Sequence, residues 1–242
     1  MRRAENKAGA RGPGTPHDAT HANATGTRCM NQRLLLATGA IAAILLMVGL
    51  LGADYPLARA VHESGFEKAM MFEGGLHALD IVVGIHVWYW LAACLFIGFG
   101  LLGMLLAPRL RLPPRLAPAL FAAGLVQAAT IGLMILGKGH FGRLRPYQVF
   151  ASGDWSNVWF AGGSSFPSGH SAFYFGLFLP LAAAAPMIWQ RVVLLALPAF
   201  VVIARIDLAM HFLADVSASA LIAASVALIV SLGMRRWQRV SM

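Results

Sequence analysis

The sequence contains six runs of mainly apolar residues, and most of them are long enough to cross a lipid bilayer. A span needs about 20 such residues to cross the roughly 30 Å of hydrocarbon in a membrane. Hydrophobic residues make up 58% of the chain and charged residues only 12%, which excludes an ordinary water-soluble fold. We therefore predict an all-α, polytopic membrane protein with six transmembrane helices. The runs cover residues 34–53, 81–107, 116–137, 169–189, 192–204 and 216–234.

The lysines and arginines are distributed unequally between the two sides of this predicted layout. With six spans, 13 of the 19 basic residues lie on the side that holds both termini. Because loops rich in Lys and Arg stay in the cytoplasm, we predict cytoplasmic N- and C-termini and a location in the inner (plasma) membrane. The net charge of +9 then reflects membrane orientation, and we expect no nucleic-acid partner.

The polar segments divide the chain further. Residues 1–33 have the composition of a disordered cytoplasmic tail, and residues 235–242 form a basic cytoplasmic tail. Residues 34–234 are the predicted six-helix domain. Within it, residues 54–80 resemble an amphipathic segment that lies on the outer membrane surface, and residues 138–168 form an outer loop.

The fifth apolar run is unusually short. Only 13 uncharged residues lie between Arg191 and Arg205, which is about 20 Å of helix. Either Arg191 extends toward the cytoplasm or Arg205 lies below the outer membrane surface, where an arginine indicates a function by default. The structural alternative is that the two arginines merely bracket a short helix.

Three outer segments hold most of the polar residues that could do chemistry. They must lie on one side of the membrane, because spans three and five end where spans four and six begin. The segments are Lys138 with Arg145-Pro146, then Pro167-Ser168-Gly169-His170, and finally Arg205 with His211 and Asp215.

The last of these segments has the pattern of an activated histidine. His211 and Asp215 are four residues apart, so they share a face at the start of a helix. The carboxylate can fix the tautomer of the ring and leave the other nitrogen as a nucleophile. Arg205 is six residues before His211, so the chain must turn between them if both face one ligand.

The other two segments have the pattern of an anion site. Ser168, Gly169 and His170 open a helix, where main-chain N–H groups and the helix dipole favour an anion. Lys138 and Arg145, together with Arg205, add three cations suited to phosphate. Each pattern alone is weak, since such residues are often helix caps or solvated loop charges, but their joint occurrence is specific.

These motifs resemble those of the type-2 phosphatidic acid phosphatase superfamily, which read K-x6-R-P, P-S-G-H and S-R-x5-H-x3-D. The match runs from Lys138 to Asp215. One position differs, because Ala204 stands where the family usually has serine, and this removes a possible hydroxyl near the phosphate.

The resemblance implies a two-step phosphoryl transfer that needs no metal and no other cofactor. His211 would be the nucleophile that forms a phosphohistidine, Asp215 its orienting partner, and His170 the general acid and then base. The residues expected to hold the phosphate are Lys138, Arg145, Ser168, Gly169 and Arg205.

We therefore expect a membrane-bound lipid phosphatase whose site faces the periplasm or the outside of the cell. Its partners would be the bilayer and a lipid phosphomonoester or pyrophosphate, such as lipid A phosphate, undecaprenyl pyrophosphate, phosphatidylglycerophosphate or phosphatidic acid. One alternative is a lipid phosphotransferase that uses the same intermediate. Another is a non-catalytic protein that binds or transports lipid phosphates, although the paired His211 and Asp215 favour an enzyme.

Two further features lie next to these motifs. Arg143 and Tyr147 flank Arg145 and are expected to be solvated, with a head-group contact as the alternative. The aromatic segment 147–166 is expected to lie at the membrane interface or to form a lid over the substrate.

Overall fold

The computed structural model describes residues 30–64, 70–85, 89–110 and 113–240, and this part of the chain is helical without any strand. Most of the predicted disordered tail lies outside the described residues. The elements are α1 (Gln32–Val48), the π-helical turn η1 (Gly49–Ala53), α2 (Asp54–Glu63), α3 (Met70–Val83), α4 (Leu91–Leu110), α5 (Leu116–Phe141), α6 (Pro146–Ser152), α7 (Gly169–Ala184), α8 (Ile188–Asp207) and α9 (Leu213–Val240).

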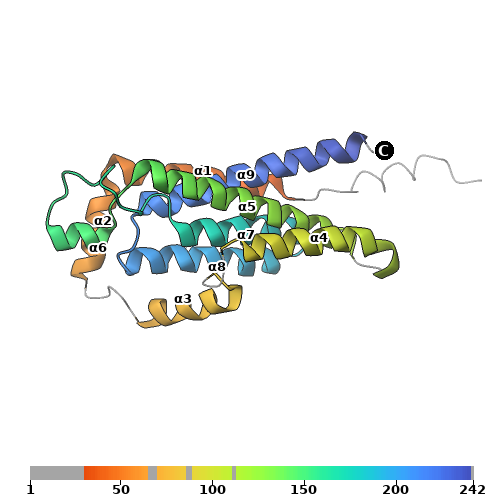
Figure 1. The fold of residues 1–242 in the computed structure, drawn as a ribbon, viewed down its shortest axis with the longest axis horizontal. Coiled ribbons are helices and arrows are strands. Elements are labelled where there is room, and N and C mark those ends of the chain that lie inside the picture. Colours follow the sequence, from red (N-terminus) through yellow and green to blue (C-terminus); the bar gives the residue numbers. More distant parts are fainter. Residues whose placement is uncertain (1–29, 65–69, 86–88, 111–112, 241–242) are drawn as a thin grey trace, which may run out of the picture.

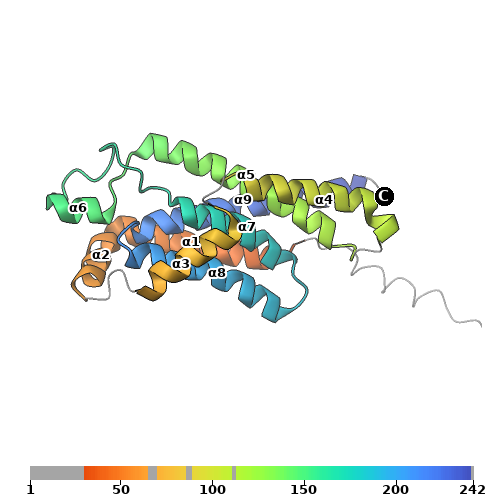
Figure 2. The same ribbon diagram turned by 60° about the horizontal axis from the view of Figure 1, so that its bottom comes forward.

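The long helices form an elongated bundle around α7 (Figures 1 and 2). Helix α7 packs against α5, α8 and α9, while α1 packs on α9 and α4 packs on α5. The short helices α2 and α6 lie at one end of the bundle, and the C-terminus lies at the other (Figure 1).

Four helical segments in the described part of the chain are long and apolar enough to cross a membrane. They are Gln32–Glu63, Leu116–Ser152, Ile188–Asp207 and Leu213–Trp237. The apolar part of α4, Leu91–Ala107, and helix α7 are shorter. Helix α7 has 16 residues, about 24 Å, and most of its side chains are buried by neighbouring helices. The chain therefore has the build of a membrane-spanning protein.

The helices differ in their limits from the predicted spans; the fourth, for example, ends at Ala184 and not at residue 189. The second and fifth spans differ most. The second does not begin at Ile81, because α3 ends at Val83 and Gly84 follows with φ +70°, a conformation that favours glycine. Helix α4 begins only at Leu91. The fifth is not short, since the turn from α7 lies at residues 185–187, and α8 is a full helix of 20 residues.

This earlier turn also accounts for one of the two arginines in the fifth run. Arg191 lies near the start of α8, and its Nε donates a hydrogen bond of 2.9 Å to the carbonyl of Ala185 after α7. Arg191 thus satisfies a carbonyl that the end of a helix leaves without an intrahelical partner. Arg205, in the last turn of α8, is buried.

Residues 54–80 contain two helices, α2 and most of α3, separated by residues outside the described ranges. Helix α3 lies along α8 and carries an apolar stripe formed by Phe72, Leu76, Leu79 and Val83. This spacing of four, three and four residues places the stripe on one helical face. It packs against the core formed by α7 and α8.

Candidate active site

The three sequence motifs meet at a cavity of about 360 Å³. Helices α3, α5, α7 and α8 contribute to its wall, together with the turn that precedes α9. Six of the eight predicted site residues line it, and the other two, Ser168 and Asp215, are buried behind it. The lining residues are Glu73, Leu76, His77, Asp80, Tyr89, Lys138, Arg145, Gly169, His170, Arg205, Leu208, Met210 and His211.

The turn after α8 brings Arg205 and His211 to the same cavity. The main-chain N–H groups of Met210 and His211 both donate to the carbonyl of Arg205, at 3.2 Å each. Ala209 lies in the left-handed region with φ +50°. The chain thus reverses between the two residues, as their six-residue separation requires.

His211 is buried beside Asp215 and lines the cavity. Its Nδ1 lies 3.6 Å from Oδ2 of Asp215 and 3.4 Å from the hydroxyl of Ser165. The Ser165 hydroxyl in turn donates a hydrogen bond to Asp215 Oδ2. Because Nδ1 faces these oxygens, Nε2 is the nitrogen left for chemistry. Burial lowers the pKa of His211 well below its ordinary value, so the ring is neutral at pH 7 and can act as a nucleophile.

Asp215 is held by groups that approach it from several directions. Arg143 Nη1 donates to its Oδ1 at 2.6 Å, and the main-chain N–H of Phe212 donates to its Oδ2 at 2.8 Å. A carboxylate buried with this many donors is stabilised in its charged form. It can therefore support positive charge that develops on His211.

Arg143 is not solvated, and that expectation from the sequence is wrong. It is buried and bridges Asp215 to Asp54, with 2.7 Å between its Nη2 and Asp54 Oδ2. Its guanidinium lies between the rings of Trp159 and Phe212, 4.3 and 4.2 Å from their centroids. Such cation–π contacts and ion pairs compensate for the loss of hydration of a buried arginine.

Asp54 connects this network to the start of α9. Its Oδ1 accepts a hydrogen bond of 2.9 Å from the main-chain N–H of Ala214. A Cβ atom at Gly49 would lie 2.7 Å from Asp54 Oδ1 and 2.9 Å from the nitrogen of Ala214. Only glycine leaves room there for the carboxylate to reach the helix end, which favours a negative charge.

The start of α7 differs in part from the arrangement that the motif suggests. Gly169 lines the cavity, and a Cβ there would lie 3.1 Å from the hydroxyl of Tyr89. Ser168 is buried and caps α7, because its hydroxyl accepts from the N–H of Ser171. The N–H of Ser168 donates to the carbonyl of Asp215 at 3.1 Å. Ser168 therefore positions the helix start and joins it to α9.

Three cations surround the cavity. Lys138 Nζ donates to the carbonyl of Ser164, and Arg145 Nη2 donates to the hydroxyl of the same residue at 3.2 Å. Arg205 Nε is buried and has no hydrogen-bond partner within the described ranges. A buried guanidinium with an unsatisfied donor is stabilised when an anion binds. The cavity therefore combines two imidazoles with a set of cations suited to an anion.

His170 faces the same cavity from α7 and pairs with a residue outside the motifs. Its Nε2 lies 3.1 Å from Oδ2 of Asp80 on α3. Asp80, Tyr89 and Ser165 are site residues that sequence reasoning missed. Neither their spacing nor their residue type distinguished them, because they reach the site through tertiary packing.

Ala204 does not face the cavity. It is fully buried and belongs to the apolar core cluster that includes Phe173, Tyr174 and Val201. The position at which this chain differs from the usual family motif is therefore not part of the cavity lining.

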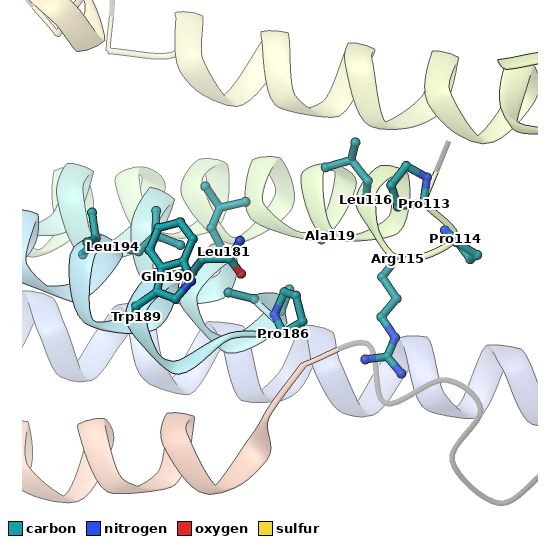
Figure 3. A pocket seen from close by; sticks show the side chains of 13 residues that line it. Pro113, Pro114, Arg115, Leu116, Ala119, Leu181, Pro186, Trp189, Gln190 and Leu194 are labelled. Atoms are coloured by element: carbon teal, nitrogen blue, oxygen red, sulfur yellow. The ribbon is translucent and has the colours of Figure 1, made fainter. Parts of the chain in front are cut away.

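A larger cavity of about 680 Å³ lies where the start of α5 faces the turn between α7 and α8 (Figure 3). Pro113, Leu116, Leu181 and Trp189 are among its mainly apolar walls, with Arg115 as the one charged side chain. Because its lining residues include no histidine or carboxylate, it lacks the groups needed for nucleophilic or acid–base chemistry. The smaller cavity is therefore the candidate active site.

Comparison with known proteins identifies a family. A family model described as the PAP2 superfamily matches residues 116–239, just over half of the chain. The match begins at α5 and includes all three motifs, whereas α3 lies outside it. No curated protein and no solved structure matches the chain.

Proposed function

The chain belongs to the PAP2 superfamily, as its resemblance to type-2 phosphatidic acid phosphatases predicted, and from this premise we propose that it is an integral-membrane lipid phosphatase. Members of this superfamily are phosphatases, so the coarse activity is hydrolysis of phosphoric esters. The observation that carries the finer proposal is the convergence of His170, His211 and three cations on one cavity.

The proposed reaction has two steps. In the first, His211 Nε2 attacks the phosphorus atom, and the bond to the leaving oxygen breaks as His170 gives that oxygen a proton. In the second, His170 takes a proton from water while the water oxygen attacks phosphorus, and the electrons of the P–N bond return to His211. Asp215 supports the positive charge on His211 in the phosphohistidine.

Lys138, Arg145 and Arg205 are proposed to bind the phosphate oxygens, with Gly169 allowing close approach to the start of α7. Phosphoryl transfer depends mainly on positioning and on stabilising charge at these oxygens. Three cations supply that charge from the protein itself, which is why we propose a metal-independent hydrolase. Activity that survives treatment with EDTA would support this point, and activity restored only by Mg²⁺ would contradict it.

The proposed orientation places the site outside the cytoplasm. We propose that α4 and α7 complete a six-span bundle with the four longer helices, so that the termini share the cytoplasmic side. The C-terminus lies at the end of the bundle away from α2 and α6 (Figure 1). Labelling of single cysteines by an impermeant reagent in intact cells tests this, with residue 154 expected to react and a cysteine at the C-terminus expected to be protected.

The size of the cavity supports a lipid substrate that enters only by its head. A volume of about 360 Å³ accommodates a phosphate and part of a head group, while acyl or prenyl chains would remain in the bilayer. We propose a lipid phosphomonoester or pyrophosphate, and the four candidates named above are equally compatible with these contacts.

Phosphate release by the purified protein in detergent tests the function. The unaltered protein should release inorganic phosphate from at least one lipid of the candidate panel without any acceptor lipid. His211→Ala should lower the rate at least about 10⁴-fold, because the nucleophile is lost. His140→Ala is the matched control, since His140 is exposed at the end of α5 and does not line the cavity.

Two further readouts separate the alternatives. Quenching with alkaline detergent during turnover should trap a phosphoenzyme in the unaltered protein and none in His211→Ala, because the P–N bond of a phosphohistidine survives in base and hydrolyses in acid. Release that appears only when an acceptor lipid is added would identify a phosphotransferase. Tight binding of lipid phosphates without turnover would identify a non-catalytic binding protein, and either result would overturn the proposed hydrolase.

A further inference from the structure

Helix α3 carries a buried carboxylate that contacts the second histidine of the site. Asp80 is only 3% exposed, and its Oδ2 lies 3.1 Å from Nε2 of His170. Its Oδ1 accepts a hydrogen bond of 2.9 Å from the hydroxyl of Tyr174. His170 and Tyr174 lie one turn apart on α7, so the two oxygens of one carboxylate are held by two successive turns of that helix.

Packing of α3 explains why Asp80 points toward α7. The apolar stripe of Phe72, Leu76, Leu79 and Val83 packs against the core of α7 and α8. Asp80 is four residues after Leu76 and three before Val83, so it lies on the same face of the helix. The stripe thus fixes the rotation of α3 and brings the carboxylate to His170.

We propose that Asp80 is a positioning residue for His170 and, through it, for protonation of the leaving group. This inference rests on the proposed phosphatase reaction. A carboxylate that accepts a proton from Nε2 fixes the orientation of the ring and leaves Nδ1 to exchange protons with the substrate. It also stabilises the imidazolium, the form that His170 needs in order to act as an acid.

The proton balance follows from this arrangement. In the first step the Nδ1 proton passes to the leaving oxygen as its bond to phosphorus breaks, and His170 becomes neutral while Nε2–H remains on Asp80. In the second step Nδ1 receives a proton from the attacking water, which restores the imidazolium. Asp80 itself gains and loses no proton.

The alternative is that Asp80 merely fastens α3 to α7. The two roles differ in how a variant responds to the leaving group. An aryl phosphate has a leaving group that departs without protonation, whereas an alkyl phosphate needs the acid. If the variant loosened α3 from α7, the cavity would be distorted and hydrolysis of both substrates would slow alike. If it instead disturbed the orientation of His170, hydrolysis of the alkyl ester should slow selectively.

The experiment compares Asp80→Asn with the unaltered protein on p-nitrophenyl phosphate and on a short-chain phosphatidic acid. The quantity compared is kcat/KM, because it includes only the steps up to departure of the leaving group. We expect Asp80→Asn to lower kcat/KM about 10- to 100-fold for the lipid phosphate and less than about 3-fold for the aryl phosphate. The lipid effect is below the 10²–10⁴-fold that general acid catalysis contributes as a whole.

Two other variants complete the design. Asp154→Asn makes the same change at an exposed loop carboxylate and should leave both substrates unaffected. Tyr174→Phe removes the second hydrogen bond to Asp80 but keeps the carboxylate, so it should lower the lipid-to-aryl ratio about 2- to 5-fold. This variant carries the test if Asp80→Asn does not fold.

The outcomes separate this inference from the proposed function. If the unaltered protein hydrolyses both substrates and the Asp80 and Tyr174 variants leave the ratio unchanged, Asp80 is a structural residue and the phosphatase stands. If the unaltered protein hydrolyses neither these substrates nor the wider lipid panel, the proposed function fails, and the inference falls with it.

Discussion

The two histidines of the cavity each pair with an aspartate, but the pairs are built differently. His211 and Asp215 lie four residues apart at the start of α9. Asp215 is fully enclosed and receives hydrogen bonds from Arg143, Ser165 and the main chain. His170 and Asp80 are 90 residues apart and meet only because α3 packs on the bundle.

This difference indicates that the proposed nucleophile, His211, and the proposed acid, His170, depend on separate parts of the fold. His211 is oriented by a local segment and a buried ion network, which does not include α3. The orientation of His170 depends on a peripheral helix outside the matched family region. Substitutions should therefore divide into those that slow every substrate and those that slow only substrates with poor leaving groups.

Among the variants that test this comparison, the largest effect is expected for Asp215→Asn. An amide cannot support the charge on His211 and presents an N–H group that favours the wrong tautomer, so kcat/KM should fall about 10³- to 10⁴-fold. Because the proposed nucleophile would serve all substrates, p-nitrophenyl phosphate and phosphatidic acid should be affected equally. A selective loss on the lipid, as proposed for Asp80→Asn, would erase the distinction between the two pairs.

The next effect concerns stability. Arg143→Met should fill the space between Trp159 and Phe212 but leave the carboxylates of Asp54 and Asp215 buried without their cation. Removing one partner of such a buried network costs about 3–5 kcal/mol, and thermal unfolding in detergent should show a clear drop in Tm. Arg59→Met is the matched control, since its ion pair with Glu63 is exposed and contributes little. Equal Tm values for the two variants would show that the network does not stabilise the fold.

A smaller effect is expected from pH. Burial lowers the pKa of His211 in the folded protein, while in the unfolded chain it returns to about 6.5. Between these values the unfolded chain binds the extra proton, so stability is full above about pH 6.5 and falls as the solution becomes more acidic. The slope contributed by this residue is at most about 1.4 kcal/mol per pH unit. Thermal unfolding from pH 5 to 8 should show a shallower acid loss for His211→Gln, and an identical slope would indicate that other groups cause it.

The smallest effect tests whether the acid pair depends on packing of α3. A Cβ at Gly75 would lie 2.8 Å from Cζ of Phe200, whereas a Cβ at Gly74 meets nothing within 4 Å. Gly75→Ala should shift α3 and lower kcat/KM about 2- to 5-fold for phosphatidic acid, with little change for the aryl phosphate. Gly74→Ala introduces the same helix-favouring residue without the contact and serves as the control. A loss in both variants would point to helix stability and not to docking.

The membrane character and the motif residues could be predicted from the sequence because both depend on short stretches of chain. The length and composition of an apolar run are enough to predict that it prefers lipid. The four-residue spacing of His211 and Asp215 is enough to predict that they share a helical face. The limits of the helices were less predictable. Helix α3 ends just before Gly84, and α8 starts after the turn at residues 185–187. Neither limit could be predicted, because the apolar composition continues through both places.

The amino-acid sequence alone is enough to tell that this chain is helical and apolar, that it carries the three family motifs, and that its basic residues gather on one predicted side. The burial of Arg143 between Asp54 and Asp215 and the contact of Asp80 with His170 depend instead on how the helices pack. The two kinds of feature differ in their range along the chain. The helical face on which a residue lies follows from its spacing to near neighbours. The partner of a buried charge depends on how distant helices pack, because burying an unpaired charge is strongly unfavourable.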